Sequence, residues 1–182
     1  MSYPLFIGID VSSKENSVCC LTKDEERHPV ARFSIANNRP GIHTLKEKIN
    51  HLTEKHDFDR LLFGLEHTGC YSTHVAMYLQ QHLKFHCPDV AVYKFNPGMI
   101  KQFKKAHFLD APKNDRVDAW YIAARLKSGL LPHPFTWNEP LLALQKLTRA
   151  RYHLIQNLVR ESNVLMSNLY LKCSDYTLVF KN

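Results

Sequence analysis

The amino-acid sequence predicts an α/β fold in which a mixed five-stranded sheet is flanked by helices. Short apolar runs joined by turns come first, and each later apolar run follows a segment of helical periodicity. Strands connected through a helix tend to lie parallel, whereas strands joined by tight turns lie antiparallel. The 182 residues, 45% of them hydrophobic, are enough for one domain with a sizeable core and a helical appendage.

Three strands open the chain. We expect them at residues 5–11, 17–22 and 30–35, because each segment is apolar or alternates apolar with polar residues. Short turns connect them, so the sequence predicts an antiparallel meander. Asp10 comes at or near the carboxyl end of the first strand.

Helices and strands alternate after the meander. Apolar residues at helical spacing predict a helix around residues 42–52, and an apolar run from Arg60 predicts a strand that ends on Glu66. The remaining expected elements are a helix at 71–83, a strand at 90–93, a basic helix at 99–105 and a helix at 120–126. Together these elements form a domain that we place at residues 1–130.

The last part of the chain, residues 131–182, is predicted to be a linker and a long helical arm. From Asn138 or Glu139 onward, leucines recur at steps of four or seven residues, and Arg151 and Glu161 interrupt this stripe. A coiled-coil-like arm that pairs with another subunit, giving a homo-oligomer, fits the pattern. A helix packed on its own domain fits it as well, so both interpretations stay open.

Positive charge is concentrated in the second half of the chain. The net charge is +7, and residues 1–93 carry 10 Lys/Arg against 11 Asp/Glu, a net of −1. Residues 94–182 carry 14 against 6, a net of +8. A polyanion, most commonly a nucleic acid, is expected to bind the second half. The alternative is a solvated basic surface without such a partner.

The sequence gives no sign of export or membrane insertion. No apolar run is long enough to span a bilayer, and the N-terminus lacks a charged segment followed by an apolar one. The five cysteines are odd in number and include no C-x-x-C pair. We therefore expect a cytoplasmic protein with reduced, mostly buried thiols.

Four carboxylates are the candidate catalytic and metal-binding residues. Asp10 and Glu66 end two strands, and Asp115 and Asp118 share one helix face because they are three residues apart. The carboxyl ends of parallel strands open into one crevice. A site of oxygen ligands alone suits Mg²⁺ or Mn²⁺ rather than zinc.

Basic residues near this motif are candidates for binding the phosphate backbone of a nucleic acid. They are Lys101, Lys104, Lys105, Lys113 and Arg116. Each carboxylate also has a simpler interpretation. An Asp after a strand is often a turn former, and a Glu there is often solvated. Asp115 and Asp118 suit the first turn of a helix, where acids are favoured.

Four short motifs occur in a specific order. They are G-I-D-V-S at residues 8–12, E-H-T-G-C-Y at 66–71, N-P at 96–97 and K-N-D-R-V-D-A at 113–119. This set resembles the DEDD transposases of the insertion-sequence 110 family, which include the pilin gene-inverting recombinase and the RNA-bridged recombinases. The resemblance covers roughly residues 5–170. Asn114 and His67 depart from the residues that are common in the family at these positions.

The resemblance implies a RuvC-like, RNase H-type fold and a metal-dependent enzyme. It assigns Asp10, Glu66, Asp115 and Asp118 to the family's metal-binding DEDD set, with DNA as a partner and a guide RNA as an open addition. Family members continue beyond the arm into a domain that supplies a serine nucleophile. We expect this domain to be absent here, since no such segment follows the arm within the 182 residues.

Three functions are consistent with these observations. The first is the N-terminal catalytic domain of a DNA transposase or recombinase, which cleaves and transfers DNA strands together with the serine domain. The second is a stand-alone junction nuclease of the RuvC type. The third is a non-catalytic nucleic-acid-binding assembly module in which the arm pairs two subunits.

Overall fold

The computed structural model describes residues 3–23, 28–67, 69–81, 83–107 and 115–175, without the side chains of residues 107, 115 and 116. The chain divides into two units, Met1–Trp137 and Asn138–Asn182. The first unit holds a five-stranded sheet and four helices among these residues, and the second holds one long helix.

The sheet is mixed, as the sequence predicted. Its order is β3-β2-β1-β4-β5, and the strands are β1 (Tyr3–Val11), β2 (Glu15–Leu21), β3 (Ala31–Ala36), β4 (Phe58–Glu66) and β5 (Asp89–Phe95). The first three form an antiparallel meander, and β4 and β5 run parallel to β1. Ile7 shows the central place of β1, because it pairs with Cys20 on one side and Phe63 on the other.

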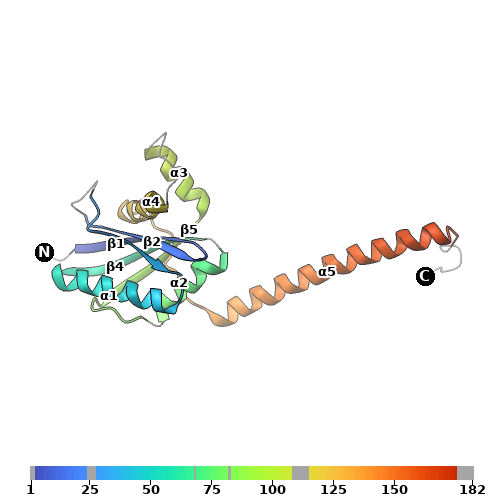
Figure 1. Ribbon diagram of the computed structural model, residues 1–182, viewed down its shortest axis with the longest axis horizontal. Helices are drawn as coiled ribbons and strands as arrows, with labels where there is room; N and C mark the ends of the chain where they lie inside the picture. The colour runs from blue at the N-terminus through green and yellow to red at the C-terminus, as the bar shows by residue number, and fades with distance from the viewer. Residues whose placement is uncertain (1–2, 24–27, 68, 82, 108–114, 176–182) are drawn as a thin grey trace. The chain divides into compact units, whose positions relative to one another are not determined.

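Helices cover both faces of the sheet. They are α1 (Arg39–Lys55), α2 (Gly69–Gln81), α3 (Pro97–His107) and α4 (Asp115–Lys127). Helices α1 and α2 lie on one face and α3 and α4 on the other (Figure 1). Because side chains alternate along a strand, Leu5, Ile7 and Ile9 of β1 pack toward α1 and α2, and Phe6 packs toward α4.

Helix α1 shows how the predicted periodicity becomes packing. Ile42, Leu45 and Ile49 are fully buried, and each such side chain contributes about 1.5–3 kcal/mol when it leaves water. The helix begins where the Asn38 side chain accepts a hydrogen bond from the Gly41 N–H at 2.9 Å. The amphipathic stripe thus fixes α1 on the face of the sheet away from α4.

Residues 131–137, which the sequence assigned to a linker, lie along the first unit. The Phe135 N–H donates to the Val92 carbonyl at 2.7 Å, and Gln80 bonds both the Phe135 carbonyl and the Trp137 N–H. Leu131 packs in the apolar cluster beside α4. These contacts explain why the division between the units falls after Trp137.

The second unit is the helix α5 (Glu139–Lys172), and its existence agrees with the predicted arm. The Asn138 side chain caps it by accepting from the Leu141 N–H at 2.9 Å. None of its residues is buried within the chain, and most of its leucines are exposed, Leu154 by 69% and Leu158 by 66%. No described helix is both long enough and apolar enough to cross a membrane.

Candidate metal and nucleic-acid site

Helix α4 lies directly on two glycines that pair with each other in the sheet. Gly8 of β1 is the register partner of Gly64 of β4. A Cβ atom at Gly8 would overlap backbone atoms of Ala119 and Ala123, and one at Gly64 would lie 2.9 Å from Ile122 Cγ2. The backbone of α4 therefore reaches β1 only because Gly8 has no side chain, and the side chains of Ile122 and Leu126 occupy the space over Gly64. We call this pair of glycines the glycine seat.

Asp10 and Glu66 stand two residues beyond this glycine pair, one on each strand. Two residues is one full repeat along a strand, so both positions belong to the face that carries α4. They come directly after the register pair of Ile9 with Leu65, on parallel strands about 4.8 Å apart. Both residues are half-buried. The structure thus places two of the predicted carboxylates at neighbouring strand ends.

The first turn of α4 carries the other two predicted carboxylates. Asp115 is the first residue of the helix and precedes Ala119 by four residues, and Asp118 precedes Ile122 by four. Residues four apart lie on the same face of a helix. Asp115 therefore lies in line with Ala119, which packs over Gly8, and Asp118 lies in line with Ile122, which packs over Gly64. The side chain of Asp115 is outside the described part of the structure.

Asp118 is paired with a lysine from the neighbouring helix. Lys104 Nζ of α3 lies 2.7 Å from Asp118 Oδ1, and the two side chains are only 28% and 21% exposed. The ammonium group also lies 5.7 Å from the ring centroid of Tyr121. Burial raises the pKa of the Tyr121 hydroxyl above its ordinary value. The positive charge of Lys104 lowers this pKa and the negative charge of Asp118 raises it, but burial is the largest effect. Lys104, predicted to bind phosphate, thus holds a predicted metal ligand.

A full metal-ligand cluster is not formed among the residues that the structure describes. Within them, no three His, Cys, Asp or Glu side chains are close enough together to hold an ion. Carboxylates without a cation repel one another, and Asp118 is held by Lys104 instead. The donor set of oxygen atoms alone fits Mg²⁺ or Mn²⁺. The convergence of all four carboxylates stays a prediction.

Helix α3 brings basic side chains next to α4. It starts at Pro97 after Asn96, whose side chain accepts from the Gly98 N–H at 2.8 Å, and Ile100 buries its apolar side against the sheet. Of the five predicted phosphate-binding residues, Lys101 and Lys105 are exposed on this helix and Lys104 is half-buried. Lys113 and the side chain of Arg116 lie outside the described residues.

Three features of the site were not foreseen from the sequence. The glycine seat has a signal that could have revealed it, because G-x-D at residues 8–10 and G-x-E at 64–66 share one spacing. The pairing of Lys104 with Asp118 has no such signal, since it depends on how α3 and α4 pack. A pocket beside Asp10, lined in part by Arg32, was also missed.

The sequence matches the model of a protein family, and the fold is similar to that of solved structures. The family model of the DEDD transposases of the insertion-sequence 110 group, described as "Transposase", matches residues 7–172. The structure of RuvC from Thermus thermophilus is similar, with 12% identity, a TM-score of 0.46 and coverage of 72% of this chain and 99% of that chain. RuvC from T. thermophilus in complex with a Holliday junction substrate gives 10% identity with the same TM-score and coverage. No curated protein matches the sequence.

Proposed function

Because the chain belongs to the DEDD transposases of the insertion-sequence 110 family, we propose that its first unit is the catalytic domain that cleaves and transfers DNA strands in such a transposase. Its sheet, an antiparallel meander extended by two parallel strands, is of the RuvC-like, RNase H type. The observation that supports the proposal most is the glycine seat. Asp10 and Glu66 follow this pair by two residues on neighbouring strands, on the face that carries α4.

The proposed metal ligands are Asp10, Glu66, Asp115 and Asp118, with Mg²⁺ or Mn²⁺ as the ion. Such ions, bound in pairs, activate the attacking oxygen and stabilise the leaving oxygen of a phosphodiester. Asp10 and Glu66 are held by paired strands, so their backbone positions exist before any ion arrives. To bind an ion, Asp118 would have to give up its ion pair with Lys104. The Lys104 ammonium group would then be available to bind a phosphate oxygen.

The proposed nucleic-acid surface begins on α3. Lys101 and Lys105 are exposed there, and Lys113 and Arg116 follow in the sequence. The net charge of +8 on residues 94–182 supports a polyanionic partner (14 Lys/Arg minus 6 Asp/Glu). DNA is the proposed substrate, a guide RNA is an open second partner, and the cytoplasm is the proposed place of action. The serine nucleophile for strand transfer is assigned to a further domain of the family.

The proposed role of α5 is to pair two copies of the chain. Leu144, Leu147, Leu154, Leu158 and Leu165 lie at steps of three, seven and four residues, which forms a coiled-coil seam. These side chains are 58–69% exposed within the chain. An isolated helix with so many exposed leucines gains stability by burying them against a partner.

Charge on this seam selects the antiparallel arrangement of the two helices. In a parallel pair, Arg151 would face the partner's Arg151, and Glu161 the partner's Glu161, which costs energy. In an antiparallel pair centred at the level of Gln156, Arg151 faces the partner's Glu161 and Leu154 faces the partner's Leu158. Among the described residues, Glu161 pairs with the exposed Arg160, at 3.2 Å.

Calorimetric titration with Mg²⁺ or Mn²⁺ tests the metal assignment. The wild-type chain is expected to bind the ion, and the double variant Asp10→Ala with Asp115→Ala is expected to lose this binding. Asp175→Ala is a matched control, because it removes an exposed carboxylate from the second unit. Equal affinity in the wild type and the double variant would refute the metal site. Metal-dependent cleavage of branched DNA by this chain alone would instead favour a stand-alone junction nuclease.

A further inference from the structure

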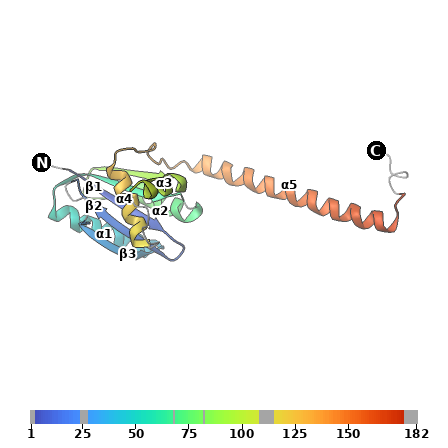
Figure 2. The same cartoon turned by 90° about the horizontal axis from the view of Figure 1, so that it is seen from above.

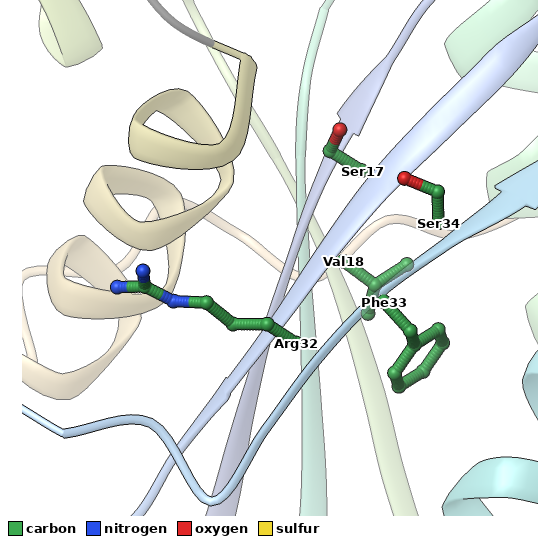
Figure 3. Close-up of a pocket in the computed structure, with 5 residues that line it drawn as sticks. All are labelled: Ser17, Val18, Arg32, Phe33 and Ser34. Atoms are coloured by element: carbon green, nitrogen blue, oxygen red, sulfur yellow. The ribbon is translucent and has the colours of Figure 1, made fainter.

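A pocket of about 210 Å³ opens on the strand pair β2–β3. Ser17, Val18, Arg32, Phe33 and Ser34 line it (Figure 3). Ser17 alternates with Cys19, which packs in the cluster beside α4, so Ser17 belongs to the α4 face of the sheet. Arg32 and Ser34 are the register partners of Cys19 and Ser17 and share that face. Figure 3 shows Arg32 extended toward α4 and the two serine hydroxyls close to each other.

The pocket lies in one row with the proposed metal site. Asp10 pairs with Ser17 across β1 and β2, and Ser17 pairs with Ser34 across β2 and β3. Two strand spacings separate Asp10 from Ser34, about 9–10 Å. The N-terminal turn of α4, where Asp118 lies, is at the same end of the sheet as Ser17 (Figure 3). A group bound in the pocket is therefore a close neighbour of the carboxylates.

The polar groups of the pocket are hydrogen-bond donors, and Arg32 contacts the Cys19 thiol of the neighbouring strand. Arg32 is exposed, and no carboxylate in the described part of the chain pairs with it. The Ser17 and Ser34 hydroxyls likewise have no side-chain partner among the described residues. The neighbouring Cys19 thiol supplies no charge, because burial raises its pKa despite Arg32. A guanidinium and two hydroxyls with free donor capacity suit an anion with several oxygen atoms.

We propose that this pocket binds a phosphodiester of the strand that passes through the carboxylate site, next to the scissile phosphate. The inference rests on the proposed function and extends it to the opposite side of the site. Asp10 and Glu66 lie on the two central strands, the lysines of α3 follow β5, and the pocket lies on β2 and β3. A backbone crossing the site from α3 meets donors on both sides. Guanidinium and hydroxyl contacts to phosphate hold the strand without reading its bases.

Fluorescence anisotropy of labelled oligonucleotides tests the proposal. The full chain and its Arg32→Gln variant are titrated onto single-stranded DNA and onto RNA of the same sequence, at several salt concentrations. We expect Arg32→Gln to weaken binding by about 3- to 10-fold at low salt. The slope of log K against log salt should fall by about 0.7, the value for one lost phosphate contact on a single strand.

Arg39→Gln is the matched control, because Arg39 is exposed on α1, on the other face of the sheet, and its loss changes the charge equally. Ser34→Asp is the second variant. It places a carboxylate in the pocket at an exposed position, and we expect it to weaken binding at least as much as Arg32→Gln. Thermal unfolding of each variant verifies that the fold is kept.

The outcomes separate this inference from the proposed function. Equal losses for Arg32→Gln and Arg39→Gln, or none for Ser34→Asp, would overturn the pocket assignment while salt-dependent binding by the wild type leaves the proposed function intact. A wild-type chain that binds neither oligonucleotide would overturn both. Dependence on Arg32 with DNA, RNA or both supports the pocket and identifies the strand that it holds.

Discussion

Lys104 Nζ lies 2.7 Å from Asp118 Oδ1, and this ion pair joins α3 to α4 at the edge of the proposed metal site. An ammonium group here neutralises a carboxylate that would otherwise repel its neighbours on the strand ends. The same lysine is a candidate for binding phosphate. If Asp118 holds a metal ion as proposed, Lys104 would lose this partner and its ammonium group would be available to a phosphate oxygen.

Removal of this lysine is expected to strengthen metal binding. In Lys104→Met the ion no longer competes with an ammonium group for Asp118, so the Mg²⁺ affinity should rise by roughly 3- to 10-fold, as for a partly buried ion pair. Isothermal titration calorimetry measures the change. Lys101→Met, an exposed residue of the same helix, is the control and should leave the affinity near that of the wild type. Weaker Mg²⁺ binding in Lys104→Met would contradict the competition.

The glycine seat makes a prediction about stability. Gly8→Ala forces a methyl group against backbone atoms of Ala119 and Ala123, which cannot move as a side-chain end can. We expect a loss of about 1–3 kcal/mol or more in the free energy of unfolding, from urea titration. Gly98→Ala is the comparison, because among the described residues its new methyl group meets the end of the Asn96 side chain at 3.3 Å and no backbone atom. Similar losses for the two variants would show that α4 does not depend on the seat.

The antiparallel pairing of α5 predicts a specific response to charge. Arg151→Glu would face the partner's Glu161 with a like charge, so the dimer should weaken. The double variant Arg151→Glu with Glu161→Arg should restore it, and sedimentation equilibrium measures both. In a parallel pair, Arg151→Glu only replaces one like-charged layer with another and leaves the affinity unchanged. A monomeric wild type at high concentration would contradict pairing of either kind.

Alkaline pH is expected to destabilise the fold through a buried thiol. Burial raises the pKa of Cys20 above its ordinary value of 9.0, so the unfolded chain releases this proton at a lower pH than the folded chain. Stability is then complete below pH 9 and declines as the pH rises above it, by at most about 1.4 kcal/mol per pH unit. Cys20→Val should reduce this decline between pH 7 and pH 10, measured by urea unfolding. Cys70→Ser, at an exposed position, should not.

Much of the first unit follows from sequence patterns. Apolar runs and turns predict all five strands within a few residues, because each strand is buried on at least one face and its neighbours are joined by short or helical connections. Helix α4 begins at Asp115, so Asp115 and Asp118 lie in its first turn, as their spacing predicted. The five-stranded mixed sheet is confirmed.

The candidate site was predictable only in part. Asp10 and Glu66 were predicted at strand ends, because both follow an apolar run. Asp115 and Asp118 were predicted on one helix face, because they are three residues apart, and the resemblance joins the four carboxylates into one set. The pairing of Lys104 with Asp118 joins residues 14 apart through the packing of two helices, which no local pattern encodes. The pocket depends on the register of Ser17 with Ser34, which is set by how the β2–β3 hairpin closes.

The seat of α4 also has a consequence for how the sequence can change over time. Over Gly8, the spacing between this helix and the sheet is set by backbone atoms of Ala119 and Ala123, which lie close to the strand. Apolar residues on the opposite face, such as Ile42 and Leu45, can therefore drift among similar sizes while the carboxylate positions stay fixed. We therefore expect more substitutions to be tolerated in that core than at Gly8 and Gly64, where an added side chain would collide with α4.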